Sequence, residues 1–219
     1  MKALVVVAHD DDVVLWMGGV VHHLHDWNWH LVSMCNQGNI ERRGYFEETS
    51  RRLNARSSAL DFGDYQEISK ASSPNSVSRM KQDLLKIVED QTYDFLFTHS
   101  RDPNGEYSPH HNHYEVCCVV RSLVSEGRLI DQANRLAYFC YSPIYPVKVL
   151  ATVARQDAKY YYQLSYEDLS IKVELIRSHL KPIIDNLEQC LGAPCPNPEA
   201  FEGDNLILPL PFRERDFVI

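Results

Sequence analysis

The sequence predicts a three-layer, Rossmann-like α/β domain with a mostly parallel central sheet. Three observations indicate this class. Residues 3–8 form a Val-rich run that is apolar throughout, as in a strand buried on both faces. Short strand-like runs then alternate with amphipathic helical segments along the chain. No repeat or linker interrupts the sequence, so we expect one domain, residues 1–219, in which 192–219 form an extended C-terminal tail.

Short runs rich in apolar and aromatic side chains predict the strands. In chain order they are residues 3–8, 31–36, 93–98, 136–141 and 160–164. Polar or turn-forming residues follow the early runs, most clearly at 37–39, Gln-Gly-Asn. In an open parallel sheet, ligands bind outside the carboxyl ends of the strands, so these following residues are where we expect a site.

Segments with apolar side chains at helical spacing separate the strands. We expect helices at residues 18–25, 47–60, 76–88, 111–126 and 165–191. The first opens at Gly18, and the second stops at Gly63, a residue suited to a helix C-terminus. The last begins with a capping box at Ser165 and is kinked or broken at Pro182. The tail beyond it holds five of the eleven prolines, so we expect it to wrap the surface.

Composition and charge narrow the function classes. The chain has 22 Lys and Arg against 30 Asp and Glu, a net charge of -8, without a basic block. We therefore expect no nucleic-acid partner. The apolar run at 3–8 is too short for a membrane span or a signal-peptide core, so we expect no membrane association and a cytoplasmic location. A homo-oligomer remains open.

Two clusters of ionisable residues follow predicted strands. Residues 9–12, His-Asp-Asp-Asp, come directly after the first strand, and His110 and His113 stand at the start of a helix. Adjacent carboxylates repel one another unless a cation neutralises them. Two imidazoles and one carboxylate, with positions left for water, are a common ligand set for catalytic Zn²⁺ or Fe²⁺. Either cluster alone is a weak signal, but together they predict a divalent metal site.

Both clusters resemble motifs of the LmbE/PIG-L family of zinc-dependent N-acetylglucosaminyl-type deacetylases. Residues 7–12, VAHDDD, with Gly18-Gly19 are similar to the family's AHPDDE…GG signature. Residues 98–113, THSRDPNGEYSPHHNH, are similar to its TH…NGEYGHxxH segment, and Lys172 with His179 to a late K…H pair. The resemblance covers about residues 3–185 in the same order.

The resemblance implies a role for each matching residue. The metal, Zn²⁺ or alternatively Fe²⁺ or another divalent ion, would be bound by His9, Asp12 and His113. Asp11 would be the general base that activates water. His110 would stabilise the tetrahedral intermediate or protonate the leaving amine, and Tyr107 would assist at the oxyanion.

Four further residues are candidates for substrate contact. Arg51 falls near a substrate-binding arginine of the family, although the matching glutamate three residues later is Asn54 here. Arg42 and Arg43 follow the second strand, where they either reach the site or lie in a solvated loop. His99 follows the third strand, as a pocket wall or a supporting residue.

Three positions depart from the family pattern. The proline of AHPDDE is Asp10, which adds charge to the turn, and its glutamate is Val13. Whatever hydrogen bonds that glutamate makes must therefore be absent or supplied elsewhere. Residues 108–109, Ser-Pro, replace a single glycine and lengthen the Tyr–His spacing by one. None of these changes removes a metal ligand or the base.

The sequence therefore predicts a metal-dependent hydrolase that removes an N-acyl group, acetyl in the first instance. Its partner would be a small molecule, an amino sugar or amino sugar conjugate. Two alternatives remain open. The first is a non-catalytic metal- or ligand-binding protein on the same fold, which Asp10 and Val13 favour. The second is a nucleotide-sugar transferase that uses Asp10 and Asp12 as a DxD motif, which leaves His110 and His113 unexplained.

Overall fold

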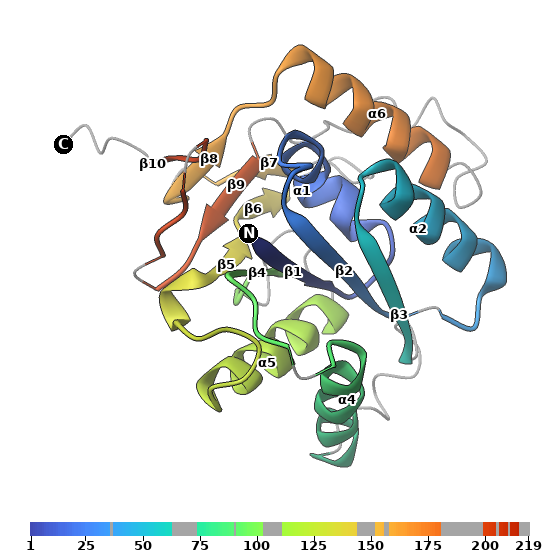
Figure 1. The fold of residues 1–219 in the computed structure, drawn as a ribbon, viewed down its shortest axis with the longest axis vertical. Helices are drawn as coiled ribbons and strands as arrows, with labels where there is room; N and C mark the ends of the chain where they lie inside the picture. The colour runs from blue at the N-terminus through green and yellow to red at the C-terminus, as the bar shows by residue number, and fades with distance from the viewer. Residues whose placement is uncertain are drawn as a thin grey trace.

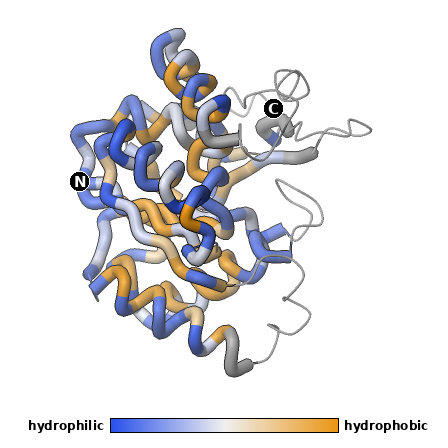
Figure 2. Tube along the Cα trace, turned by 90° about the vertical axis from the view of Figure 1, so that its right-hand side faces the viewer, coloured by the Kyte–Doolittle hydropathy of each residue, from blue (hydrophilic) through white to orange (hydrophobic). Residues whose placement is uncertain are grey.

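The computed structural model describes most of the chain. The described residues are 1–35, 37–62, 74–89, 91–102, 111–143, 152–155, 158–180, 199–204, 206–209 and 211–214. They form a central sheet with helices on both faces, which is the fold class that the sequence predicts (Figure 1). Apolar segments run through the middle of the molecule and polar segments lie outside (Figure 2).

Five parallel strands make the main part of the sheet. In spatial order they are β5 (Leu136–Phe139), β4 (Phe95–Thr98), β1 (Lys2–Val7), β2 (Asn28–Cys35) and β3 (Arg56–Phe62). Three antiparallel strands extend the sheet beyond β5, namely β9 (Glu199–Glu202), β8 (Tyr160–Tyr162) and β10 (Arg213–Glu214). A separate two-stranded sheet pairs β6 (Tyr141–Pro143) with β7 (Thr152–Ala154).

The helices form two outer layers. One layer holds α1 (Asp12–His23), α2 (Ile40–Arg52) and α6 (Tyr166–Leu180), and the other holds α4 (Pro74–Ile87) and α5 (His111–Ser125) (Figure 1). A short 3₁₀ helix spans Ala133–Arg135. Among the described residues, none of the helices has the length and apolar character that a membrane span requires.

The apolar run of β1 follows from this layering. Alternate side chains of a strand point to opposite faces, so a strand covered on both faces must be apolar throughout. Ala3, Val5 and Val7 pack into the core beneath α1, α2 and α6. The intervening residues of the same strand pack against α4 and α5. The chain emerges from this fully buried strand directly into the residues of the first ionisable cluster.

The helix predicted at 47–60 is wrong in its second half. Helix α2 instead begins at Ile40, after Asn39 accepts a hydrogen bond from the Arg42 N–H, and ends at Arg52. Asn54 has a positive φ of 54°, which turns the chain into β3. Strand β3 is an edge strand with partly exposed side chains, so its sequence lacks the apolar run that marks a buried strand.

The C-terminal tail lies partly inside the molecule, which contradicts the expectation that it wraps the surface. Strand β9 inserts between β5 and β8, and its Ala200 and Phe201 are fully buried. Leu206 and Phe212 of the following segment are buried as well. Prolines interrupt the short apolar runs of the tail, so its sequence shows no clear strand pattern. The predictions at Gly63 and Pro182 lie outside the described residues.

Helix α1 is kinked, and it begins earlier than predicted. It starts at Asp12, and Met17 has non-helical angles of φ −151° and ψ 20°. Gly19 follows the kink, where the helix runs against Leu164. A Cβ atom at Gly19 would lie 2.2 Å from Leu164 Cδ2, whereas a Cβ at Gly18 would meet only ordinary contacts at 3.5 Å and beyond.

We expect Gly19→Ala to destabilise the fold by about 1–3 kcal/mol, because the buried Leu164 side chain leaves no room for the methyl group. Gly18→Ala is the matched control, and we expect it to be neutral or stabilising by up to about 1 kcal/mol. Urea unfolding of the two variants measures both values. Equal stability of the two variants would contradict the close packing of α1 on Leu164.

Candidate metal centre

Three potential metal ligands meet at the carboxyl end of β1. His9 lies in the turn after the strand, Asp12 begins α1, and His113 lies in the first turn of α5. One possible ligand atom from each lies within 4.8 Å of the others, and all three residues are buried. Within the described part of the chain, no other group of His, Cys, Asp and Glu meets this geometry. His113 of the second cluster therefore meets His9 and Asp12 of the first, because β1 and β4 are adjacent in the sheet.

Asp12 is at the centre of the group. Its Oδ2 accepts the His9 backbone N–H at 2.8 Å, and its Oδ1 lies 3.4 Å from Nε2 of His113. Burial opposes ionisation, but the facing imidazole of His113, together with hydrogen bonds from His113 and His9, holds the pKa of Asp12 well below its ordinary value. Two imidazoles around an ionised carboxylate suit a divalent cation such as Zn²⁺ or Fe²⁺, so the residues present fit the predicted metal.

His99 supports this group from behind. Its Nε2 accepts the Ala8 backbone N–H at 2.8 Å, so the lone pair of that nitrogen is already used. The His99 ring stacks on the His113 ring with centroids 3.8 Å apart, and His99 is fully buried. The structure therefore places His99 beneath the ligands and not on a surface that a substrate reaches.

Arg42 neutralises the charge that Asp10 adds to the turn. Its Nε donates to Asp10 Oδ2 at 3.0 Å, and its Nη2 forms a further ion pair with the same carboxylate. The same Nη2 also lies 3.5 Å from Asp11 Oδ1. Asp10 is almost fully buried, so an uncompensated charge there would be costly. Arg42, a candidate for substrate contact, is thus engaged with two carboxylates of the acidic turn.

Asp11 is the carboxylate of the turn that remains accessible. Its side chain is 18% exposed, against 3% for Asp10 and 5% for Asp12. Burial raises the pKa of Asp11 above its ordinary value, the adjacent Asp12 raises it further, and Arg42 opposes both. A carboxylate with a raised pKa that still meets solvent is suited to act as a general base.

Solved structures with this fold include enzymes of more than one activity. The deacetylase of the teicoplanin biosynthesis pathway, in complex with teicoplanin, matches with a TM-score of 0.60 at 12% identity, over 92% of this chain and 96% of that one. The conserved protein TT1542 of Thermus thermophilus matches with a TM-score of 0.59 at 18% identity, over 95% and 97%. GalB, the 4-carboxy-2-hydroxymuconate hydratase of Pseudomonas putida, matches with a TM-score of 0.55 at 15% identity, over 100% and 99%.

The fold is shared with these proteins. At these identities the likeness extends to the fold and no further. No family model matches the chain, and no curated protein matches it in sequence. The chemistry of the site must therefore be argued from its own residues.

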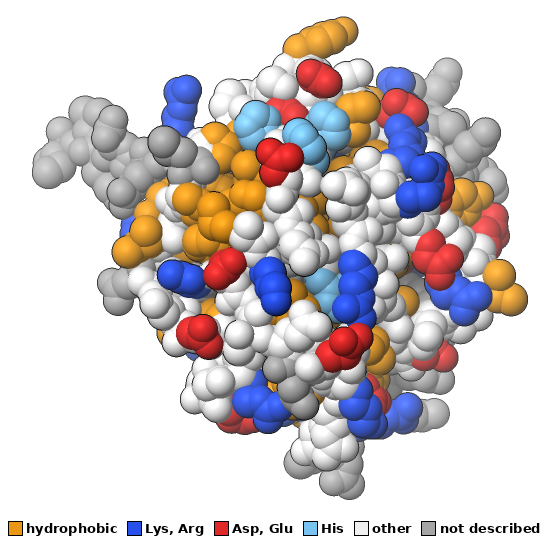
Figure 3. Space-filling view, in the orientation of Figure 1, with side chains coloured by type: hydrophobic (Ala, Val, Ile, Leu, Met, Phe, Trp, Pro, Cys, Tyr) orange, Lys and Arg blue, Asp and Glu red, His pale blue; other side chains and the backbone are white. Residues whose placement is uncertain are grey.

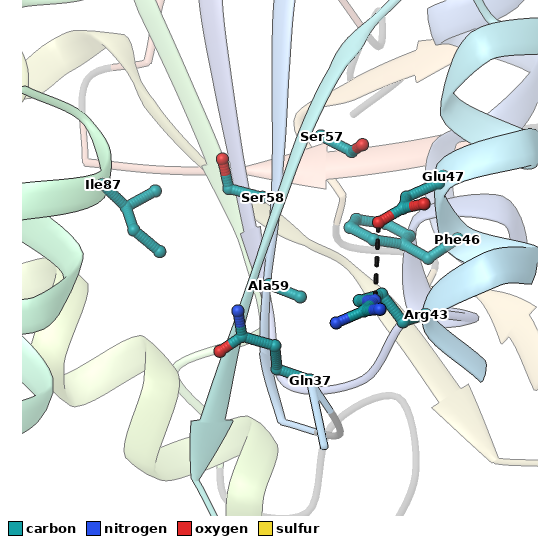
Figure 4. Close-up of a pocket in the computed structure, with 8 residues that line it drawn as sticks. All are labelled: Gln37, Arg43, Phe46, Glu47, Ser57, Ser58, Ala59 and Ile87. Atoms are coloured by element: carbon teal, nitrogen blue, oxygen red, sulfur yellow. Dashed lines mark ion pairs between the residues drawn. The ribbon is translucent and has the colours of Figure 1, made fainter. Parts of the chain in front are cut away.

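The structure does not bring the other arginine candidates to the ligands. Arg51 lies at the exposed end of α2, where its Nη2 pairs with Glu48 at 2.6 Å. Arg43 pairs with Glu47 at 3.6 Å and lines a separate cavity of about 310 Å³ beside β3 (Figure 4). Tyr107 and His110 lie outside the described residues, as does the side chain of His179.

Sequence reasoning missed two side chains beside the ligands. Asn112 Nδ2 lies 3.4 Å from His9 Nε2 and 3.7 Å from Cys35 Sγ, at the end of β2. Trp16 Nε1 donates to Asp12 Oδ1 at 3.3 Å. The spacing of four residues from Asp12 to Trp16 is the helical signal that could have revealed the second contact.

A second group of histidines lies elsewhere and has a different partner. His22 and His23, at the end of α1, place their Nδ1 atoms 3.0 and 3.4 Å from the carboxylate of Asp168. Histidine side chains gather at the surface over this end of the helix (Figure 3). The Asp168 carboxylate also accepts hydrogen bonds from Tyr162 and Ser165, so it is already engaged as a structural cap.

The pairing of Arg42 with Asp10 makes a testable contribution to stability. We expect Arg42→Gln to destabilise the fold by about 2–4 kcal/mol, because it leaves a buried carboxylate without its cation. Arg43→Gln is the matched control, since its exposed pair with Glu47 contributes less than about 0.5 kcal/mol. Denaturant unfolding of both variants checks the difference, and a similar loss in each would contradict the role given to Arg42.

Proposed function

We propose that this protein is a divalent-metal-dependent hydrolase that removes an N-acyl group, acetyl in the first instance, from an amino sugar or amino sugar conjugate. The observation that carries the proposal is the buried group of His9, Asp12 and His113 with the accessible Asp11 beside it. The residues around the group are arranged to hold a cation and to accept a proton at one edge. Amide hydrolysis at neutral pH requires both functions.

Each residue of the proposed site has a separate role in the reaction. His9, Asp12 and His113 hold the cation, which when bound polarises the acyl carbonyl and lowers the pKa of water. Asp11 takes the proton from the water that attacks the acyl carbon. The C–N bond then breaks and releases acetate and a free amine. By the resemblance of the sequence, His110 gives the amine its proton and Tyr107 stabilises the charge on the carbonyl oxygen.

The hydratase that shares the fold defines the main rival reaction. A hydratase adds water across a carbon–carbon double bond, and that addition also needs an activated water and a base. The fold alone does not separate the two activities. The two motifs in residues 7–12 and 98–113 favour the deacetylase, because they resemble the LmbE/PIG-L signatures.

The remaining alternatives conflict with particular contacts. A DxD motif would need the carboxylates of Asp10 and Asp12 to share one cation, but Asp10 is engaged with Arg42 and Asp12 faces two imidazoles. A non-catalytic binding protein has no need for an accessible base, and Asp11 keeps its carboxylate at the edge of the site.

The test is an assay of products on the purified protein loaded with Zn²⁺, or with Fe²⁺ in the absence of oxygen. The substrates are N-acetylglucosamine, its glycosides and other N-acetylated amino sugar conjugates. We expect equal amounts of acetate and free amine to appear. Metal binding without acetate or amine from any member of the panel would favour the binding protein. Hydration of a conjugated unsaturated acid, with no deacetylation, would favour the hydratase.

A further inference from the structure

The kink in α1 lies between the Trp16 carbonyl and the Val20 N–H, two backbone groups that bond to side chains from outside the helix. In an unbroken helix the Val20 N–H would donate to the carbonyl oxygen of Trp16, four residues earlier. The non-helical angles of Met17 interrupt this pattern. Both groups are buried, so each needs another partner.

Residues from distant parts of the chain take both positions. The Trp16 carbonyl accepts the hydroxyl of Tyr141, from β6, at 2.7 Å. The Val20 N–H donates to Glu199 Oε2, from β9, at 2.8 Å, and the Gly19 N–H donates to Oε1 of the same carboxylate at 3.0 Å. Side chains of β6 and β9 thus bond to the backbone groups on both sides of the kink.

These partners are themselves fixed. The hydroxyl of Tyr141 also accepts the Ala200 backbone N–H, at 3.1 Å, which ties β6 to β9. Lys172 of α6 pairs with Glu199 at 2.6 Å, and both side chains are fully buried. A buried carboxylate requires such a cation, and the pair holds it in place against the helix. The geometry of the kink is therefore set by α6, β6 and β9 together.

The Trp16 side chain contacts both Tyr141 and Asp12. The indole packs on the Tyr141 ring, with centroids 5.0 Å apart, and its Nε1 donates to Asp12 Oδ1 at 3.3 Å. That oxygen is the one that faces His113 Nε2 at 3.4 Å. The hydrogen bond uses one lone pair of the oxygen and restricts the rotation of the carboxylate.

We propose that Trp16 is a positioning residue for the metal ligand Asp12, and that Tyr141 and Glu199 hold Trp16 in place through the kink. The inference rests on the proposed metal site. Val13 offers no hydrogen-bonding group at the position where the family has glutamate, and the indole N–H of Trp16, one helical turn beyond Asp12, is a donor that does reach the acidic turn. The C-terminal strand β9 thereby contributes to the metal centre without touching it.

The test compares two indole N–H groups. Trp16→Phe removes the bond to Asp12 and keeps an aromatic ring. Trp29→Phe is the matched control. Trp29 is equally buried, and its Nε1 donates to the Leu24 carbonyl at 2.8 Å. Trp29 lies near the start of β2, beside the end of β1 that is opposite the site. Each protein, freed of metal, is titrated with Co²⁺ alone, and binding is followed by the visible absorption of the bound ion. Urea unfolding of the metal-free proteins measures stability in parallel.

We expect Trp16→Phe to weaken Co²⁺ binding by about 10- to 100-fold and to change its absorption bands, as the loss of a hydrogen bond to a metal ligand does. Trp29→Phe is expected to bind Co²⁺ with the affinity of the unaltered protein, even where the two variants lose similar stability. A Co²⁺ affinity of Trp16→Phe within twofold of the unaltered protein would overturn the inference.

A second pair of variants keeps the inference testable if Trp16→Phe fails to fold. Tyr141→Phe removes the hydroxyl that holds the Trp16 carbonyl, and we expect it to weaken Co²⁺ binding several-fold. Its control is Tyr160→Phe, whose hydroxyl donates to the Leu206 carbonyl and not to α1. Equal Co²⁺ affinity in these two variants would also count against the inference. Absence of Co²⁺ binding by the unaltered protein would overturn the metal site as well, whereas binding without deacetylation would overturn only the proposed reaction.

Discussion

His113→Gln is expected to abolish stable binding of a divalent metal and, with it, hydrolysis. The variant removes one of three protein ligands and also an imidazole that faces the ionised Asp12. Loss of a supporting hydrogen bond typically weakens metal binding by about 10- to 100-fold, so loss of a ligand itself should exceed about 100-fold. Metal content after dialysis, together with Zn²⁺ titration, measures the effect.

The control for this variant is His111→Gln. His111 lies two residues earlier at the start of α5 and is exposed, so the same substitution there should leave metal binding unchanged. A helix places residues two apart on different sides, and His113 points toward Asp12. Retention of full metal content by His113→Gln would mean that the ligand set is wrong.

The location of the site could be predicted because it depends on local signals. A strand covered on both faces must be apolar throughout, and β1 has that pattern. The carboxyl ends of adjacent parallel strands lie at one edge of a sheet. The strands in residues 3–8 and 93–98 are also adjacent in the sheet, so the residues that follow them lie close in space. The meeting of His9 and Asp12 with His113 confirms this part of the prediction.

Strands β3 and β9 could not be predicted in the same way, for opposite reasons. Strand β3 is at the edge of the sheet, and its sequence, RSSALDF, carries polar side chains that suit a partly exposed position. Strand β9, with the sequence EAFE, is buried, but its Glu199 is acceptable there only because Lys172 and the N–H groups of α1 surround it. Neither condition is visible in the local sequence.

The same limit applies to the departures from the family motif. Asp10 in place of proline suggested unbalanced charge, and the balancing Arg42 lies 32 residues away on α2. Val13 in place of glutamate removes a hydrogen-bonding side chain from the turn, and Trp16, four residues beyond Asp12 on the same helix, donates a hydrogen bond to Asp12. The charge of Asp10 is compensated by a contact that depends on tertiary packing, since Arg42 is distant in the sequence. A motif read position by position therefore does not show how the charges of this turn are balanced.

Asp11→Asn is expected to reduce hydrolysis by about 100- to 10,000-fold while the protein keeps its metal, because general-base catalysis contributes an effect of this size. Asparagine has nearly the same shape as aspartate but cannot accept the proton of the attacking water. It also leaves His9, Asp12 and His113 in place, so Zn²⁺ affinity should change far less than turnover.

Asp94→Asn controls for the loss of one carboxylate. The Asp94 carboxylate accepts the Lys2 N–H at the other end of β1. Parallel measurement of acetate release and metal content separates the role of Asp11 from that of His113, whose replacement should remove both. Normal turnover in Asp11→Asn would assign the base to another residue and leave the metal site standing.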